Sequence, residues 1–140
     1  MAAFKKGMEL GADLVECDVH LSKDGHLIVM HDDSVDRTTD GKGLIRDLSL
    51  AELRKLDAGS GERIPTLEQL IAWVATQPQL GLVVELKRSG VAALPRLVAD
   101  AIRKRGISKR TIVISFDPHQ LQELKEYAPE LASGLLYHKA

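Results

Sequence analysis

Two carboxylates separated by one residue stand inside an otherwise apolar segment, Glu16-Cys17-Asp18. Side chains alternate along a strand, so Glu16 and Asp18 share one face of the strand, at a separation of roughly 7 Å. Two bare carboxylates are costly to bury, and a hard divalent cation with oxygen ligands is a natural partner for them. The alternative is an amphipathic strand with a solvated face, which the pattern favours when it is taken alone.

A third acid interrupts the apolar segment Leu82–Leu86. Glu85 lies within it, and Lys87 follows two residues later on the same face. A strand buried on both faces does not ordinarily carry a charge pair, whereas active sites assemble at the carboxyl ends of parallel barrel strands. We therefore expect Glu85 to complete a site of three carboxylates and Lys87 to hold an anion beside it. A structural Glu–Lys pair at the end of the sheet is the alternative.

His31 ends the second strand of a predicted hairpin, and its side chain suits general acid–base chemistry. The turn before this strand can set the register in two ways. A two-residue turn, Asp24-Gly25, places His31 opposite Asp18 and on the same face, which the chemistry favours. A three-residue turn with a left-handed Gly25 places His31 opposite Cys17 instead. The other four histidines are expected at the surface or at strand ends: His20, His26, His119 and His138.

The elements that must position these residues follow from hydrophobic periodicity and turn signals. A hairpin over 13–31 is followed by a turn-rich segment over about 32–65, in which Ser49 and Glu52 form a capping box for a short helix. Helices and short apolar strands then alternate, which predicts an α/β fold with a parallel sheet; a small doubly wound sheet is the alternative. The expected elements are a helix at 66–77, a strand at 82–86, a helix at 91–105, a strand at 111–116, a helix at 118–127 and a strand at 131–137.

Length and composition limit the classes of function. The chain has 140 residues and a formal net charge of −1, which predicts one domain and argues against a nucleic-acid partner. The single cysteine, Cys17, excludes an internal disulfide. No apolar stretch approaches the ~18 residues of a transmembrane segment. A cytoplasmic location is expected, with a signal peptide ahead of Met1 as the alternative.

Three blocks of sequence resemble the glycerophosphodiester phosphodiesterase family, which belongs to the phospholipase-C-like phosphodiesterase barrels. Residues 11–53 contain E-x-D, K-D-G, H-D-D and D-R-T-T-x-G-x-G, and the later blocks are I-P-T-L-E-Q-L and V-V-E-L-K. The resemblance implies a metal-dependent hydrolase of lipid and glycerol metabolism that converts glycerophosphodiesters to glycerol 3-phosphate and an alcohol. It also implies Mg²⁺ or Ca²⁺ as cofactor. The implied roles are metal binding for Glu16, Asp18 and Glu85, catalysis for His31 and substrate binding for Lys87.

The sequence departs from the family pattern at its start. The family begins with H-R-G and P-E-N-T motifs, which carry a first catalytic histidine, a phosphate-contacting arginine and an acidic residue, and neither motif occurs here. The resemblance implies a TIM barrel fold, which needs about 250 residues, whereas this sequence has 140. We therefore expect residues 1–140 to form a partial TIM (β/α) barrel, inactive alone, with an insertion at about 32–65 after an antiparallel hairpin.

Two other functions compete with this interpretation. A non-catalytic partial barrel would bind a partner, or a second copy of itself, through its open strand edges and apolar faces. Another phospholipase-C-like phosphodiesterase, such as a phosphatidylinositol- or sphingomyelin-type lipase, would need an apolar membrane-facing loop. The segment 32–65 offers scattered leucines for such a loop.

Overall fold

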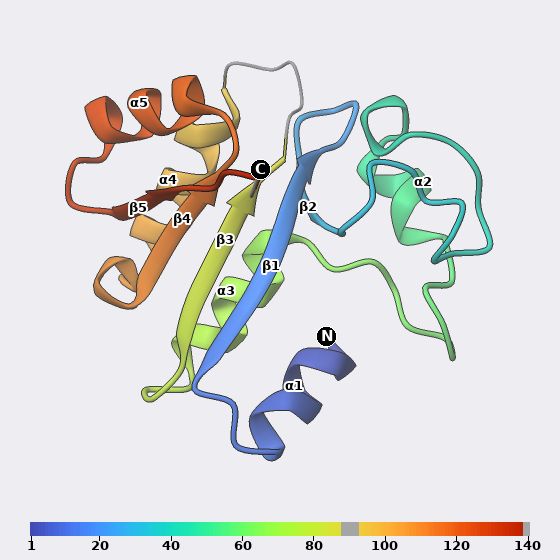
Figure 1. Ribbon diagram of the computed structural model, residues 1–140. Helices are drawn as coiled ribbons and strands as arrows, with labels where there is room; N and C mark the ends of the chain where they lie inside the picture. The colour runs from blue at the N-terminus through green and yellow to red at the C-terminus, as the bar shows by residue number, and fades with distance from the viewer. Residues whose placement is uncertain (88–92, 139–140) are drawn as a thin grey trace.

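The computed structural model describes residues 1–87 and 93–138, and within these residues five strands form one sheet in the order β2-β1-β3-β4-β5 (Figure 1). Strand β2 runs antiparallel to β1, whereas β1, β3, β4 and β5 pair in parallel. This confirms the predicted α/β class, with an antiparallel hairpin followed by a parallel sheet. The strands are β1 (Leu14–Leu21), β2 (Leu27–Val29), β3 (Gly81–Leu86), β4 (Thr111–Ser115) and β5 (Ala132–Leu135).

Helices connect the parallel strands, and three of them begin at side-chain caps. Ser49 accepts a hydrogen bond from the backbone of Glu52 in the predicted capping box, Thr66 forms a second capping box with Gln69, and Asp117 caps the helix that follows it. No helix of the described residues is long and apolar enough to cross a membrane. The helices are α1 (Ala2–Glu9), η1 (Ile45–Asp47), α2 (Leu50–Arg54), α3 (Leu67–Ala75), α4 (Leu94–Lys104), η2 (Ser108–Arg110) and α5 (Pro118–Tyr127); residues 91 and 92 of the predicted 91–105 helix lie outside the described residues.

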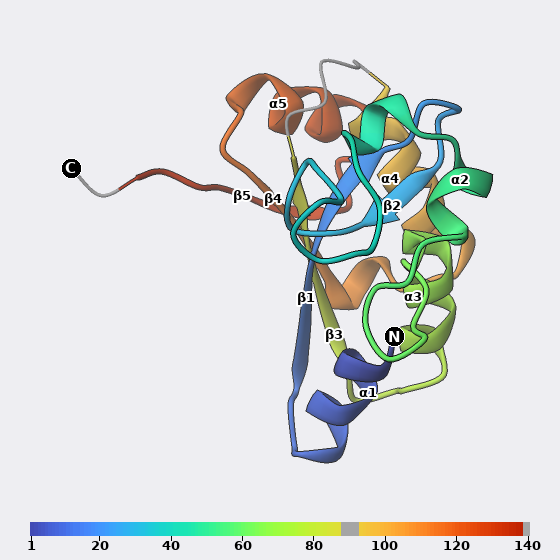
Figure 2. The ribbon, with the colours of Figure 1, turned by 90° about the vertical axis from the view of Figure 1, so that its right-hand side faces the viewer.

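The main core lies between one face of the sheet and the helices. Alternation along β1 turns Val15, Cys17 and Val19 to this face, and the buried residues of β3 are likewise every second one. Figure 2 shows α1 and α3 on the same side of β1 and β3. The opposite face carries the polar residues of β1 and β3, together with exposed apolar side chains from several strands and strand ends. Those apolar residues are Leu14, Ile112 and Phe116.

The turn-rich segment after the hairpin has a second hydrophobic core of its own. Val35, Ile45 and Leu53 are almost fully buried there, and Ile28 of β2 and Ile64 complete the cluster. The segment is therefore packed against the hairpin through apolar contacts.

The hairpin register differs from the one that the chemistry favoured. Val19 pairs with Val29, and the backbone N–H of Met30 donates to the carbonyl of Asp18 at 3.0 Å. Asp18 thus lies opposite Met30 and not opposite His31. The cause is the turn: Gly25 has a φ of 81°, the left-handed conformation of the three-residue alternative. Strand β2 ends at Val29, so His31 reaches its place on the chain that leaves the sheet.

The second core generates a stability prediction. Leu53→Ala should lower the free energy of unfolding by about 2–5 kcal/mol, because it leaves a cavity at a fully buried position. Leu10→Ala is the matched control at a position 77% exposed, with an expected change within about 0.5 kcal/mol. Denaturant titration followed by circular dichroism measures both. Equal effects of the two substitutions would contradict a packed second core.

Candidate active site

Three carboxylates come together on the face of the sheet opposite the main core, which we call the open face. The parallel register of β1 and β3 places Asp18 beside Glu85. Glu16 lies two residues before Asp18, on the same face of β1. Each residue offers one carboxylate oxygen, and the three oxygens lie within 4.8 Å of one another. Asp18 is buried at 8% exposure, Glu16 is exposed, and Glu85 is partly buried. The three acids that the sequence singled out therefore form one cluster.

The geometry and chemistry of this cluster suit a hard divalent cation. Oxygen ligands lie at about 2.0–2.6 Å from Mg²⁺ or Ca²⁺, so two ligands of one ion are separated by at most about 5 Å. The oxygen separations fall inside this limit, and all three donors are carboxylates. The identity of the ion depends on how many further oxygens surround it, so Mg²⁺ and Ca²⁺ both stay open as predictions.

The crowding of negative charge changes the protonation of the cluster. Partial burial, and after it the charge and hydrogen bond of Asp18, raises the pKa of Glu16 to about 7. Lys87 partly offsets this charge, since its Nζ contacts a carboxylate oxygen of Glu85 at 3.0 Å. Burial disfavours the charged form of Lys87, but the hydrogen bond to Glu85 and the charges of the three acids together raise its pKa. The ammonium group is therefore held positive beside the acids.

Residues of the cluster line two hollows. A cleft of about 750 Å³ is lined by Glu85 and Lys87 from the end of β3 and by Asp117 after β4. A smaller hollow of about 400 Å³ is lined by Glu16 and Asp18, among others. His31 lines both hollows, so it adjoins the carboxylates on one side and the lysine on the other. His31 is the lining residue that the two hollows share.

His31 presents its ring to solvent at the edge of this region. Its side chain is 74% exposed, and its Nδ1 lies 3.0 Å from an oxygen of Asp32. The other ring nitrogen, Nε2, has no hydrogen bond among the described residues. Proton transfer at Nε2 is therefore open to a molecule in the cleft.

His20 is a cleft residue that the sequence analysis placed among surface or strand-end histidines. It is buried at 6% exposure and lines the larger cleft together with Lys87. Burial lowers the pKa of its imidazole, so the ring is neutral near pH 7. The signal that identifies it is alternation: His20 follows Asp18 by two residues and therefore shares its face of β1. Cys17 points to the opposite face, and burial raises the pKa of its thiol, as expected for a packing residue.

Comparisons with known proteins agree on one family. The model of the glycerophosphoryl diester phosphodiesterase family matches residues 1–140. A glycerophosphodiester phosphodiesterase of Caldanaerobacter subterraneus is 44% identical over 98% of this chain and 60% of its own length.

Solved structures show the same fold. A glycerophosphodiester phosphodiesterase from Agrobacterium tumefaciens matches with a TM-score of 0.85 and 33% identity, over 94% of this chain and 58% of that one. An Oleispira antarctica phosphodiesterase, solved in complex with the product sn-glycerol-3-phosphate, matches with a TM-score of 0.88 and 35% identity, over 96% of this chain and 58% of that one. The chain thus spans about three fifths of the length of the relatives it matches.

The acidic cluster predicts a cation affinity that depends on pH. Binding requires a deprotonated Glu16, and its pKa near 7 means that protons compete with the cation at neutral pH. The affinity for Mg²⁺ or Ca²⁺ should therefore rise from pH 6 to pH 8, with about tenfold per unit as the limit for one displaced proton. Calorimetric titration of the chain measures this dependence.

Substitutions test whether the cluster holds the ion. Asp18→Asn should weaken cation binding at least about tenfold at pH 8, because it removes one charged ligand. Asp13→Asn changes an exposed carboxylate next to β1 and serves as the control. Equal affinities of the two variants would place the cation elsewhere.

Proposed function

The chain belongs to the glycerophosphoryl diester phosphodiesterase family, and on that premise we propose that it supplies the cation site and one acid–base histidine for hydrolysis of glycerophosphodiesters. The products are glycerol 3-phosphate and an alcohol. The observation that supports this most is that three carboxylates form one cluster, with Lys87 on Glu85 and with His31 lining both hollows beside the cluster. The product bound to the Oleispira antarctica relative belongs to the same chemistry.

The charges of the cleft fit a phosphodiester. A diester carries one negative charge and its monoester product about two, so the site needs positive charge that the acids alone do not provide. Lys87 offers an ammonium group inside the cleft, held in place by Glu85 at 3.0 Å. Glu16, Asp18 and Glu85 would hold a divalent cation, and such an ion would supply further positive charge and polarise phosphoryl oxygens.

His31 provides the proton transfer that hydrolysis requires. In the reaction a new bond forms between phosphorus and the attacking oxygen, and the bond from phosphorus to the leaving alcohol breaks. With water as nucleophile this gives glycerol 3-phosphate directly; with a glycerol hydroxyl it gives a cyclic phosphodiester, which one water then opens to glycerol 3-phosphate. The attacking oxygen loses a proton and the leaving oxygen gains one. The accessible Nε2 of His31 accepts or donates one of these protons at the edge of the cleft. The family pattern assigns the other proton to the histidine of the H-R-G motif.

The exposed apolar side chains of the open face favour a second behaviour, self-association. Leu14 is 62% exposed and Ile112 is 43% exposed, although both belong to parallel strands of the sheet. In a closed barrel this face is interior, so its apolar residues are selected for contact with other strands. A second copy of the chain presents the same apolar face, so two copies can cover each other's exposed apolar side chains.

A chimaera tests the catalytic proposal. The chain replaces the matching segment of the Caldanaerobacter subterraneus relative, to which it is 44% identical. We expect this chimaera to release glycerol 3-phosphate, and His31→Ala to lower its kcat by about 10²–10⁴-fold, the usual size of an acid–base contribution. His119→Ala, on α5, is the control. An active chimaera that is indifferent to His31→Ala would remove His31 from catalysis.

The isolated chain should be inactive and should self-associate. Light scattering is expected to show species larger than a monomer of 15.3 kDa, and no glycerol 3-phosphate should be released with or without Mg²⁺ or Ca²⁺. Ile112→Lys should shift the chain toward the monomer, because it places a charge on the open face. Gln122→Lys makes the same addition at an exposed position of α5 and should leave the assembly unchanged. A monodisperse, active monomer would contradict both expectations.

A further inference from the structure

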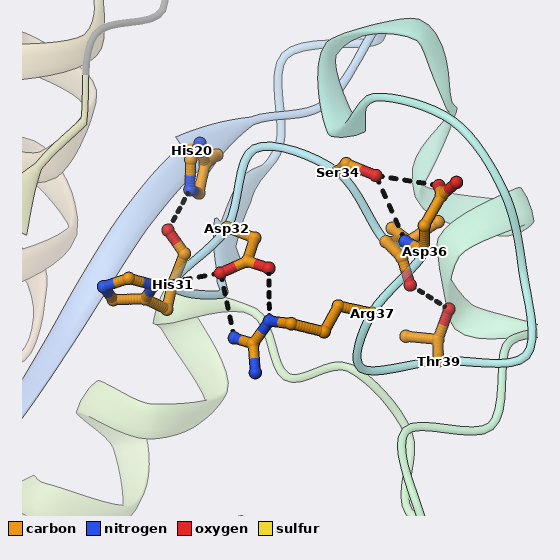
Figure 3. Close-up of polar contacts among 8 residues, drawn as sticks. His20, His31, Asp32, Ser34, Asp36, Arg37 and Thr39 are labelled. Atoms are coloured by element: carbon orange, nitrogen blue, oxygen red, sulfur yellow. Dashed lines mark hydrogen bonds and ion pairs between the residues drawn. The ribbon is translucent and has the colours of Figure 1, made fainter.

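The ring of His31 is held by the residue that follows it. Nδ1 of His31 lies 3.0 Å from Oδ1 of Asp32 (Figure 3). An ionised carboxylate can only accept a hydrogen bond, so Nδ1 must carry the proton and donate it. In the neutral ring this leaves the lone pair on Nε2. The contact therefore selects one of the two tautomers, the one whose exposed nitrogen is a base.

Asp32 is itself fixed by Arg37. Nε of Arg37 donates to Oδ2 of Asp32 at 2.8 Å, and Nη2 donates to Oδ1 at 2.9 Å. This two-point contact sets the plane of the carboxylate, which a single contact cannot do. It also keeps Asp32 ionised, since the hydrogen bonds from Arg37 and His31 hold the pKa of Asp32 well below its usual value. Oδ1 thus receives both His31 and Arg37 in one planar arrangement.

The loop that carries Arg37 is anchored in the second core. Val35, two residues before Arg37, is fully buried in that core. Thr39 Oγ1 donates to the carbonyl of Val35 at 2.7 Å, and Asp36 accepts from the backbone of Gly43 at 2.8 Å. Ser34 and Leu44 pair across the base of the loop. Burial and hydrogen bonds therefore fix the backbone on both sides of Arg37.

The backbone of His31 is held from the opposite side by the sheet. Nε2 of His20 lies 3.2 Å from the carbonyl oxygen of His31, and because a carbonyl only accepts, Nε2 of His20 donates. His20 is buried on β1, so this hydrogen bond ties the chain after β2 to the strand that carries Asp18. Figure 3 shows His20 at the backbone of His31, and Asp32 between the ring of His31 and the guanidinium group of Arg37.

We propose that Asp32, held by Arg37, is the positioning residue of His31: it fixes the ring in the tautomer that leaves Nε2 free for proton transfer in the cleft. This inference deepens the proposed function and rests on it. It gives the turn-rich segment a defined task, because the second core places the carboxylate that orients the catalytic ring. Arg37 acts on the reaction through Asp32, and Asp32 acts through His31.

Exchange of the histidine C2 proton, followed by mass spectrometry over a range of pH, tests the contact in the intact chain at low concentration. Each histidine peptide gives its own titration midpoint. Asp32→Asn should move the midpoint of His31 away from the wild-type midpoint, because it removes the carboxylate that accepts from Nδ1. The variant also removes the charged partner of Arg37, and it leaves unchanged the other charged groups that line the two hollows with His31, which are Glu16, Asp18, Asp33, Glu85, Lys87 and Asp117.

Two further variants make the result specific. Asp33→Asn removes an equal charge one residue away, and the midpoint of His31 should stay at the wild-type midpoint. Asp32→Glu keeps the charge but moves it by one methylene, so its midpoint should fall between those of the wild type and Asp32→Asn. Equal shifts from Asp32→Asn and Asp33→Asn, or no shift from either, would overturn the proposal. His20 is buried, so its exchange reports in the same data whether each variant is folded. If Asp32→Asn unfolds the chain, Asp32→Glu replaces it as the test, and a wild-type midpoint of His31 in Asp32→Glu would overturn the proposal.

The chimaera separates this inference from the function on which it rests. There, Asp32→Asn should lower kcat about 10- to 100-fold and leave KM nearly unchanged, as expected for loss of a group that orients a catalytic side chain. If the chimaera is inactive while the His31 midpoint shifts as predicted, the proposed function fails and the positioning contact stands. If the chimaera is active and Asp32→Asn leaves kcat unchanged, the positioning role fails and the proposed function stands.

Discussion

The parallel pairing of β1 with β3 is the constraint on which the site depends. It brings Asp18 beside Glu85 although 66 residues separate them in sequence, and alternation along each strand then sets which side chains face the cleft. Val15, Cys17 and Val19 enter the core on one face, while Glu16, Asp18 and His20 line the other. A shift of one residue in β1 would exchange these two sets, placing carboxylates in the core. The same burial that stabilises the sheet therefore fixes the register of the acidic cluster.

The pairing concentrates negative charge, and the surrounding residues show the consequence. Glu16 has a pKa of about 7 because burial and Asp18 both disfavour its ionised form. Lys87 reduces this repulsion in part through its contact with Glu85. A cluster that resists full ionisation in the absence of a cation gains the most from binding one, since the ion removes the repulsion among its ligands. The electrostatic repulsion among the three acids and their proposed affinity for a cation therefore have the same cause.

A second core makes the loop-rich segment part of the site. Residues from 28 to 64 bury Val35, Ile45 and Leu53 together, and this packing fixes the backbone that bears Asp32 and Arg37. His31 lies where this segment meets the sheet, between the hydrogen bond from His20 and the carboxylate of Asp32. Catalytic groups on loops keep their geometry when the loop is anchored by buried apolar side chains, and this loop is anchored in that way.

The sequence by itself determined the local features of the protein. Ser49 with Glu52 marked the start of a short helix, because capping involves residues within one turn. Alternation marked β1 and β3 and placed Glu16, Asp18 and Glu85 on polar faces. The motifs of residues 11–53 also pointed to the family that the comparisons show.

The tertiary structure decided what depends on contacts between distant segments. Both hairpin registers were compatible with the turn sequence, and the left-handed Gly25 selected the one that chemistry had disfavoured. The structure shows that the ring of His20 donates to the carbonyl of His31, which the sequence did not indicate. The contact of Arg37 with Asp32 likewise depends on the folded loop. The spacing of residues along the chain indicates which side chains share one face of a strand or helix. Which residues of distant segments come into contact depends on how the buried surfaces of those segments pack, and that packing involves the whole chain.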